Sequence, residues 1–354
     1  MAPLDWGLGH VSRCVPLMRH IRAAGHEVIF AGNDSQKSYI RDIFPDITCL
    51  TLPGYNITYS RSRAGFMPKL WIQLPGVRHR IRAEHQWLNH VISEYHPDAV
   101  ISDNRYGLYT HRIPCVFITH QLQVQTGLGA FADRLLQLFH YRFIQRFSNC
   151  WVADVAKDPG ISGILAHPRR LPAMPLTYTG LLSQCVPEEP GNSRNNYVLI
   201  LLSGAEPQRS LLSDLLWQQV QGLNRKVVFV EGTATAQRTD IPAHVRYYPR
   251  VAAEMLRQLI NDAAIVICRS GYSSLMDLAA TDQKAVLIPT PGQTEQEYLA
   301  RQLFGRQQQL SFPQKDFVLS RALEAAGSFP FLPMAAPGDF TLYRQVADKW
   351  LAGL

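Results

Sequence analysis

Short apolar, β-branched runs alternate with helical patterns along most of this 354-residue chain. Most of the runs are continuous rather than alternating, which is typical of parallel strands that are covered on both faces. Strands and helices in this order predict an α/β fold with parallel sheets. The expected strands are Glu27–Ala31, Ala99–Ser102, Val116–Thr119, Cys150–Ala153, Tyr197–Leu202, Lys226–Glu231, Ile265–Cys268 and Ala285–Ile288.

A break in this pattern predicts a domain boundary between residues 175 and 196. Proline, glycine and asparagine concentrate there, and a new strand starts at Tyr197. We therefore expect two α/β domains, residues 1–178 and 179–336, each opening with a strand and a loop of small residues. A last amphipathic helix within 337–354 can pack back on the first domain or cap the second. Its inward positions are Phe340, Leu342, Val346 and Trp350.

Composition and charge narrow the class of protein. The hydrophobic fraction of 46% and charged fraction of 18% exclude a disordered chain. No apolar run reaches the length of about 18 residues that a membrane-spanning helix needs, and no secretory signal is expected at the start. The six cysteines lack CxxC spacing, which argues against a zinc site and disulfides and favours the cytoplasm. The net charge of +7 favours anionic partners, either nucleotide phosphates or a phospholipid surface, and no nucleic-acid motif is present.

The first loop combines glycines with a histidine at the start of a helical pattern. Gly7, Gly9 and His10 precede apolar positions at helical spacing that end at Gly25. Glycines permit a tight turn and close approach of a ligand to backbone N–H groups. A histidine at a helix N-terminus has a lowered pKa, so its neutral ring can accept a proton. The motif predicts either a turn with a capping histidine or a proton acceptor at His10.

Two more polar residues follow predicted strands of the first half. Asp103 and His120 should lie at the same sheet edge as His10, because the carboxyl ends of parallel strands share an edge. Each can orient a base or contact an acceptor, or can serve in an Asx turn or a cap. His10, Asp103 and His120 are the catalytic candidates.

The second half has loops with the composition of a phosphate-binding edge. One buried strand leads into Ser203-Gly204-Ala205 and then Arg209, and another leads into Arg269–Ser274. Small residues at a helix start and a nearby guanidinium suit a diphosphate, although the first loop also reads as an ordinary turn. Asp277 can accept two ribose hydroxyls, and the loop Pro289–Tyr298 offers polar groups to a sugar.

The segment Arg269–Ala300 resembles the donor-binding region of glycosyltransferase family 28, through Arg269-Ser270-Gly271, Asp277 and Glu295-Gln296. Ser203–Ala205 and Gly7–His10 are similar to the family's two glycine-rich loops. The resemblance implies a GT-B fold, in which two Rossmann-like parallel-sheet domains face each other across a cleft. It also implies inverting transfer from a nucleotide-diphospho sugar, expected to be UDP-linked, to a hydroxyl acceptor that is lipid-linked or a glycan.

No metal and no cofactor beyond the UDP-sugar co-substrate is implied. The donor-binding residues that the resemblance implies are Gly9, Ser203, Gly204, Arg209, Arg269, Ser270, Gly271, Ser273, Ser274, Asp277, Gln293, Glu295 and Gln296.

Two other functions stay open. Gly7–Cys14 is also similar to the start of the UDP-sugar hydrolases of the pseudaminic acid pathway, which pass the sugar to water. The second function is that of a catalytically silent family member that binds a nucleotide sugar. It is suggested by Asp277, Glu295 and Leu299, which replace the family's usual Glu, Gln and Asn.

Two segments of the first half predict surface or core features. Residues 61–88 interleave arginines with aromatic side chains. This pattern fits peripheral contact with an anionic membrane on its inner face, or a partly buried helix pair with snorkelling arginines. Phe131–Phe147 is apolar enough to predict a core helix, with Leu135, Leu136, Leu138, Phe139 and Phe143 inward.

Overall fold

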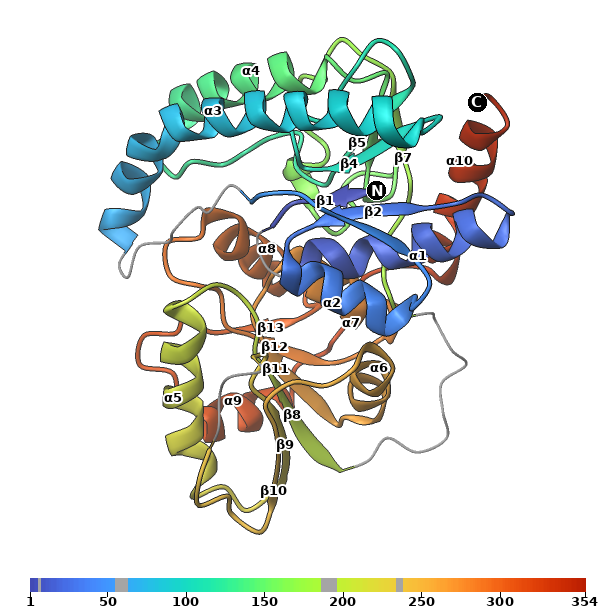
Figure 1. Cartoon of the computed structure of the whole chain (residues 1–354). Coiled ribbons are helices and arrows are strands. Elements are labelled where there is room, and N and C mark those ends of the chain that lie inside the picture. The colour runs from blue at the N-terminus through green and yellow to red at the C-terminus, as the bar shows by residue number, and fades with distance from the viewer. Residues whose placement is uncertain (6–7, 55–62, 186–195, 234–237) are drawn as a thin grey trace. The chain divides into compact units, whose positions relative to one another are not determined.

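The computed structural model describes residues 1–5, 8–54, 63–185, 196–233 and 238–354, apart from the side chains of 63–75. The chain forms two compact units (Figure 1). Unit 1 takes in Met1–Thr58, Met67–Ser183 and Pro337–Leu354, and unit 2 takes in Tyr59–Phe66 and Gln184–Ala336. The main division therefore falls after Ser183, where the sequence predicts it after residue 178, and the C-terminal segment belongs to unit 1.

Unit 1 is built on a parallel sheet with the strand order β1-β4-β5-β6-β7. The parallel pair β2-β3 continues this sheet, because the Ala31 amide of β2 donates to the carbonyl of Met1 at 2.9 Å. The chain therefore winds outward from β1 in one direction through β2 and β3, and in the other through β4 to β7. The strands are β1 (Ala2–Pro3), β2 (Ile29–Gly32), β3 (Thr48–Thr51), β4 (Val100–Asp103), β5 (Cys115–Thr119), β6 (Asn149–Val152) and β7 (Leu176–Tyr178).

Helices cover both faces of this sheet (Figure 1). The long α3 (Arg63–Tyr95) and α4 (Ala130–Ile144) lie on one face, and α1 (Gly9–Ala23) and α2 (Asp34–Ile43) lie on the other. A capping box starts α2, since Asn33 and Gln36 each accept the other's backbone N–H. The C-terminal α10 (Leu342–Leu351) follows a 3₁₀ turn at Pro337–Phe340, and Trp350 packs edge-on against Trp151 of β6 with ring centroids 5.3 Å apart.

Unit 2 repeats the same winding in a second parallel sheet of order β10-β9-β8-β11-β12-β13. Its strands are β8 (Tyr197–Leu201), β9 (Lys226–Val230), β10 (Val245–Tyr248), β11 (Ile265–Cys268), β12 (Ala285–Leu287) and β13 (Leu310–Ser311). Its helices are α5 (Gln208–Val220), α6 (Ala253–Asp262), α7 (Tyr272–Ala280), α8 (Thr294–Gly305) and α9 (Leu319–Ala326). Because β8 is central, the winding again changes direction beside it, between β8 and β11.

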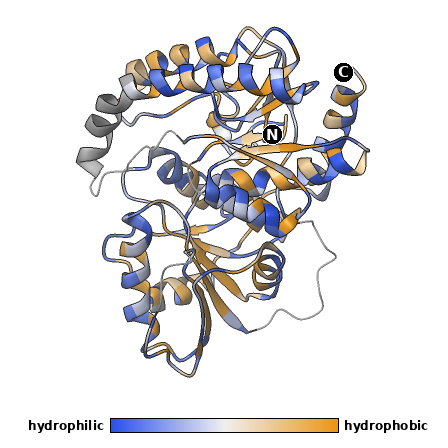
Figure 2. Ribbon diagram, viewed as in Figure 1, coloured by the Kyte–Doolittle hydropathy of each residue, from blue (hydrophilic) through white to orange (hydrophobic). Residues whose placement is uncertain are grey.

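The cores lie between these sheets and their helices. In unit 2, α5 and α9 pack their leucines on strand residues such as Ile200, Phe229 and Ile267, all of them fully buried. Figure 2 shows these strands in the hydrophobic colours, while the helices show mixed colours. Burial on both faces explains why the strands are continuous apolar runs. All eight predicted strands are present, each bound lying within two residues of the prediction.

Helix α4 differs from its prediction as a core helix. Only its last turns reach the sheet, where Tyr141, Phe143 and Ile144 are buried. In the earlier turns Phe131 is 77% exposed, Leu135 50% and Leu138 57%. The expectation that the whole segment packs inward is therefore wrong, because the first turns of α4 offer an apolar face that no described residue covers.

A buried histidine couples the stability of unit 1 to pH. His140 of α4 is 2% exposed, and its Nδ1 lies 2.8 Å from the hydroxyl of Tyr106. Burial lowers the pKa of His140 from 6.5 to about 4. Between these values the unfolded chain binds a proton that the folded chain excludes, so the free energy of unfolding falls as the pH drops from 6.5 toward 4.

We predict that His140→Gln removes part of this pH dependence. Between pH 7 and pH 5 the wild type should lose about 2 kcal/mol more of its unfolding free energy than the variant. Urea denaturation at the two pH values measures the difference. Equal losses in both proteins would contradict the assignment.

Candidate active site

The catalytic candidates of unit 1 meet where the winding of its sheet changes direction. The place outside the carboxyl ends of two such strands is the usual ligand site of open α/β sheets. The loop after β1 leads into α1, whose first two residues are Gly9 and His10, and β4 ends at Asp103. The N-cap Leu8 makes no side-chain cap hydrogen bond. Gly7 lies outside the described residues.

A buried ion pair joins α1 to β4 at this point. Arg13, 1% exposed, donates from Nε to Oδ2 of Asp103 at 2.9 Å, and its Nη2 donates to Oδ1 of the same carboxylate. This is the two-pronged geometry in which guanidinium and carboxylate fit best. Asp103 is fully buried, so the pair fixes the carboxylate in one orientation.

The imidazole of His10 shares this carboxylate. Its Nδ1 lies 3.0 Å from Oδ2 of Asp103 and 2.9 Å from Nη2 of Arg13. An unprotonated Nδ1 can accept from Nη2 of Arg13, whereas a protonated Nδ1 donates to Oδ2 of Asp103. The second tautomer is the one that catalysis by a base requires. Nε2 is then the free proton acceptor. The His10 side chain is 16% exposed, so part of the ring reaches solvent.

The surroundings set the charge states of this cluster. Burial raises the pKa of Asp103, but Arg13 and His10 outweigh it and bring that pKa to about 2. Burial and then Arg13 lower the pKa of His10, more than Asp103 raises it. His10 is therefore neutral and Asp103 ionised at neutral pH, which is the combination a general base requires.

His120 joins the cluster through Arg13. It follows β5, is 4% exposed, and its Nδ1 accepts a hydrogen bond from Nη1 of Arg13 at 3.0 Å. The sequence predicted His10, Asp103 and His120 but missed Arg13, which links all of them. The spacing of three residues from His10 was the available signal, since residues i and i+3 share a helix face.

In unit 2 the candidate loops lie at the corresponding edge. The loop Ser203–Glu206 follows β8 and the loop Arg269–Gly271 follows β11, so they flank the place where the winding changes direction. Ser203 and Gly204 are exposed, and Gly204 has a φ of +105°, which a side chain would disfavour. Helices α5, α7 and α8 begin at this edge, and none of them has a side-chain cap hydrogen bond at its N-cap residue.

Two arginines of this edge hold the loops together. Arg269 is 2% exposed and donates to the carbonyls of Ile288 at 3.1 Å and Gln208 at 2.7 Å, which ties the ends of β11 and β12 to α5. Burial lowers its pKa to about 10, so it stays charged. Arg209 pairs with Glu206 and donates to the carbonyl of Glu231 at 3.1 Å. Both guanidinium groups therefore fix the loops of this edge through hydrogen bonds to backbone carbonyls.

The remaining donor-side candidates surround the same loops. Gln296 accepts from the Thr290 amide at 2.9 Å, and its carbonyl accepts from the Ser270 hydroxyl at 2.8 Å. Asp277 in α7 is 7% exposed and accepts from Gln184 at 3.2 Å. Half-buried residues complete the edge, namely Gly271, Ser273, Ser274, Gln293 and Glu295. The structure thus brings the unit 2 candidates of three loops to one edge.

Residues 181–327 match the C-terminal domain of glycosyltransferase family 28. They span the whole edge just described. Most of unit 2 is therefore similar to this family 28 domain. The transferase that adds N-acetylglucosamine to N-acetylmuramyl-(pentapeptide) pyrophosphoryl-undecaprenol is similar over much more of the chain. The Pseudomonas syringae pv. syringae enzyme is 25% identical over 312 residues, covering 83% of this chain and 80% of its own. The Pasteurella multocida enzyme is 26% identical over 193 residues, covering 49% and 51%.

Solved structures agree on the fold. The calicheamicin glycosyltransferase CalG4 superposes with a TM-score of 0.62 at 12% identity, covering 99% of this chain and 96% of its own. Acinetobacter baumannii MurG gives a TM-score of 0.56 at 14% identity, covering 99% of this chain and 98% of its own. The fold is that of the GT-B glycosyltransferases, and with the family 28 domain these findings identify the chain as a glycosyltransferase.

Two further observations concern metals and membranes. Among the described residues, no group of three or more histidine, cysteine or acidic side chains could hold a metal ion. No described helix is long and apolar enough to cross a membrane. The predicted membrane-contact segment 61–88 falls partly outside the description, which covers side chains only from residue 76 onward.

We predict that Arg13→Met disturbs the cluster in two measurable ways. It leaves the Asp103 carboxylate buried without its main partner, which should reduce the free energy of unfolding by about 3 to 5 kcal/mol. It also removes a positive charge beside His10, so the pKa of that imidazole should rise. Urea denaturation and an NMR titration of the imidazole protons measure the two effects.

Arg13→Lys serves as the matched variant. It keeps the charge but cannot form both prongs, so it should cost less stability and leave the pKa of His10 closer to the wild-type value. A His10 pKa that stays constant across all three proteins would refute the role given to Arg13.

Proposed function

We propose that the chain is an inverting, metal-independent glycosyltransferase that moves a sugar from a UDP-sugar to a hydroxyl acceptor. The observation that carries the proposal is the neutral imidazole of His10, held by the buried Asp103 carboxylate at the ligand edge of unit 1. The family 28 domain of unit 2 supports a nucleotide-sugar donor.

His10 would act as the general base. Its Nε2 takes the proton of the acceptor hydroxyl while the oxygen forms a bond to the anomeric carbon of the donor. The bond between that carbon and the diphosphate oxygen breaks, and the nucleoside diphosphate leaves with the electron pair. A single displacement from the opposite side inverts the anomeric centre. Asp103 stabilises the imidazolium that forms, because its carboxylate lies 3.0 Å from Nδ1.

Unit 2 would hold the donor. The N-termini of α5, α7 and α8 direct backbone N–H groups and partial positive charge toward the edge where the diphosphate would bind. These groups would stabilise the negative charge of the leaving diphosphate, which is the role of a metal ion in other transferases. Asp277 would accept the ribose hydroxyls, and Glu295 and Gln296 would contact the sugar.

The acceptor class rests on the relatives. The transferases of Pseudomonas syringae and Pasteurella multocida act on an acceptor attached to pyrophosphoryl-undecaprenol. We therefore propose a lipid-linked hydroxyl acceptor, used at the inner face of a membrane with which unit 1 makes peripheral contact. Consumption of a UDP-sugar at the same rate with and without any acceptor would instead establish the hydrolase.

We predict that Asp277→Asn weakens UDP binding at least about tenfold, because hydrogen bonds to a charged acceptor contribute about 1.5 to 3 kcal/mol. Isothermal titration calorimetry of the whole chain with UDP measures the affinity. Glu324→Gln, an exposed change in α9, is the control and should bind like the wild type. Failure of the wild type to bind UDP would argue against the donor assignment.

We predict that His10→Ala lowers kcat by about 10² to 10⁴, the usual contribution of general-base catalysis, and leaves UDP affinity unchanged. His20→Ala, a histidine of the same helix, should keep wild-type turnover. The acid limb of the pH profile should lie below pH 6.5, because the pKa of His10 is lowered from that value. Full turnover by His10→Ala would exclude this base, and UDP binding without turnover of any donor would indicate a silent member.

A further inference from the structure

A carboxylate that the sequence did not indicate contacts the ligand edge of unit 2. Glu206 ends the exposed loop Ser203–Glu206 after β8. It forms an ion pair with Nη2 of Arg209, and its Oε2 accepts from the backbone amide of Ser210 at 3.4 Å. Arg209 and Ser210 are the second and third residues of α5. The Glu206 carboxylate therefore lies at the N-terminus of that helix.

The contacts of Glu206 are those that a phosphate group uses. A guanidinium group and the backbone amides of a helix N-terminus are the usual donors to phosphate oxygens. Burial raises the pKa of Glu206, but hydrogen bonds from Ser210 and the guanidinium of Arg209 outweigh it and lower that pKa. The side chain is therefore ionised at neutral pH, and it is an internal anion held by donors that suit a phosphate.

Arg209 has a second carboxylate partner, which holds it from the other side. Its Nη1 lies 3.6 Å from Oε1 of Glu231 and donates to the carbonyl of the same residue at 3.1 Å. Glu231 follows β9 and accepts from the hydroxyl of Ser213 in α5 and from Nη2 of Arg238 at 3.2 Å. Arg209 thus keeps an anchored partner when Glu206 moves away.

The two carboxylates differ in exposure, and this difference decides which of them a ligand can replace. The side chain of Glu206 is 53% exposed, whereas that of Glu231 is 3% exposed. Separating an exposed ion pair costs little, but separating a buried one leaves a charge without compensation. A phosphate group carries more charge and more acceptor oxygens than a carboxylate. It would therefore replace Glu206 and leave Glu231 in place.

We propose that the Glu206 carboxylate is an internal competitor of the donor diphosphate, which takes its place on Arg209 and the N-terminus of α5. This inference rests on the proposed function, because it requires unit 2 to bind a nucleoside diphosphate. The competition lowers the affinity for the donor and for the nucleoside diphosphate product alike, since both displace the same carboxylate. Removal of the Glu206 charge strengthens binding, which is the opposite of the effect expected for a residue that holds the ligand.

Calorimetric titration of the full chain with UDP tests the proposal, and uridine is measured as a competitor of UDP. Uridine has the same base and ribose but no phosphate, so it does not contest Arg209. The proteins are wild type, Glu206→Gln and the control Glu254→Gln. The control removes the same charge from a matched pair, because Glu254 is 64% exposed and pairs with Arg257, three residues further along α6.

We expect Glu206→Gln to bind UDP about three- to fivefold more tightly than wild type, the range that an exposed ion pair allows. Its uridine affinity should stay at the wild-type value, and Glu254→Gln should bind both ligands like the wild type. Unchanged or weaker UDP binding by Glu206→Gln would overturn the proposal, and so would equal tightening by Glu254→Gln or toward uridine.

The same titrations separate this inference from the proposed function. Wild-type binding of UDP without the Glu206 effect refutes the competitor alone and leaves the donor site standing. Failure of all three proteins to bind UDP contradicts the donor site and the competitor together.

Discussion

The buried pair of Arg13 and Asp103 is the interaction on which the organisation of unit 1 depends. It joins the first helix to the fourth strand at the place where the winding of the sheet changes direction. A buried charge without a partner is costly, so each member holds the other in place. The same pair determines the state of His10, since one member orients the ring while the other lowers its pKa. Stability and proton chemistry therefore share a single carboxylate.

The two units share one topology but place different chemical groups at the edge where the winding changes direction. Each has a parallel sheet that winds outward from a central first strand, and each presents its candidate residues where the direction changes. In unit 1 this edge contains an ionised carboxylate and a neutral imidazole, which suits proton transfer. In unit 2 it contains helix N-termini and small residues, and the buried Arg269 connects the loops through carbonyl groups. The difference lies in a few side chains at strand ends.

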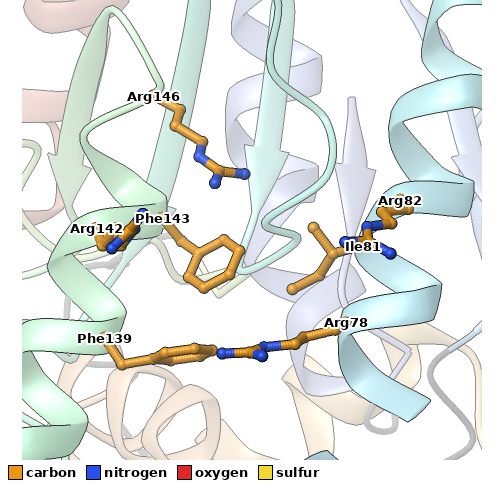
Figure 3. Close-up of a pocket in the computed structure, with 7 residues that line it drawn as sticks. All are labelled: Arg78, Ile81, Arg82, Phe139, Arg142, Phe143 and Arg146. Atoms are coloured by element: carbon orange, nitrogen blue, oxygen red, sulfur yellow. The ribbon is translucent and has the colours of Figure 1, made fainter. Parts of the chain in front are cut away.

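Positive charge is used in two distinct ways in this chain. Arg13 and Arg269 are buried and engaged with protein groups, so they build the edges rather than present charge to solvent. The arginines between α3 and α4, labelled in Figure 3, line an open cavity without carboxylate partners among the described residues. A net charge of +7 indicates anionic partners in general, but only burial and pairing separate the arginines that stabilise the fold from those available to a ligand.

The sequence by itself determined the α/β class, eight of the thirteen strands of the described residues, and the positions of the polar loops. These follow from local patterns, because a strand buried on both faces must be apolar along its length, and loops at parallel strand ends share an edge. It also indicated His10 and Asp103 separately, as residues after a glycine turn and after a strand.

Only the tertiary structure decided that Arg13 joins them, since residues 90 positions apart meet through sheet winding rather than through any local pattern. It likewise decided that Phe131 and Leu138 are exposed. An apolar helix sequence shows which residues avoid water, but the packing of the helix against the rest of the fold determines which of them are buried.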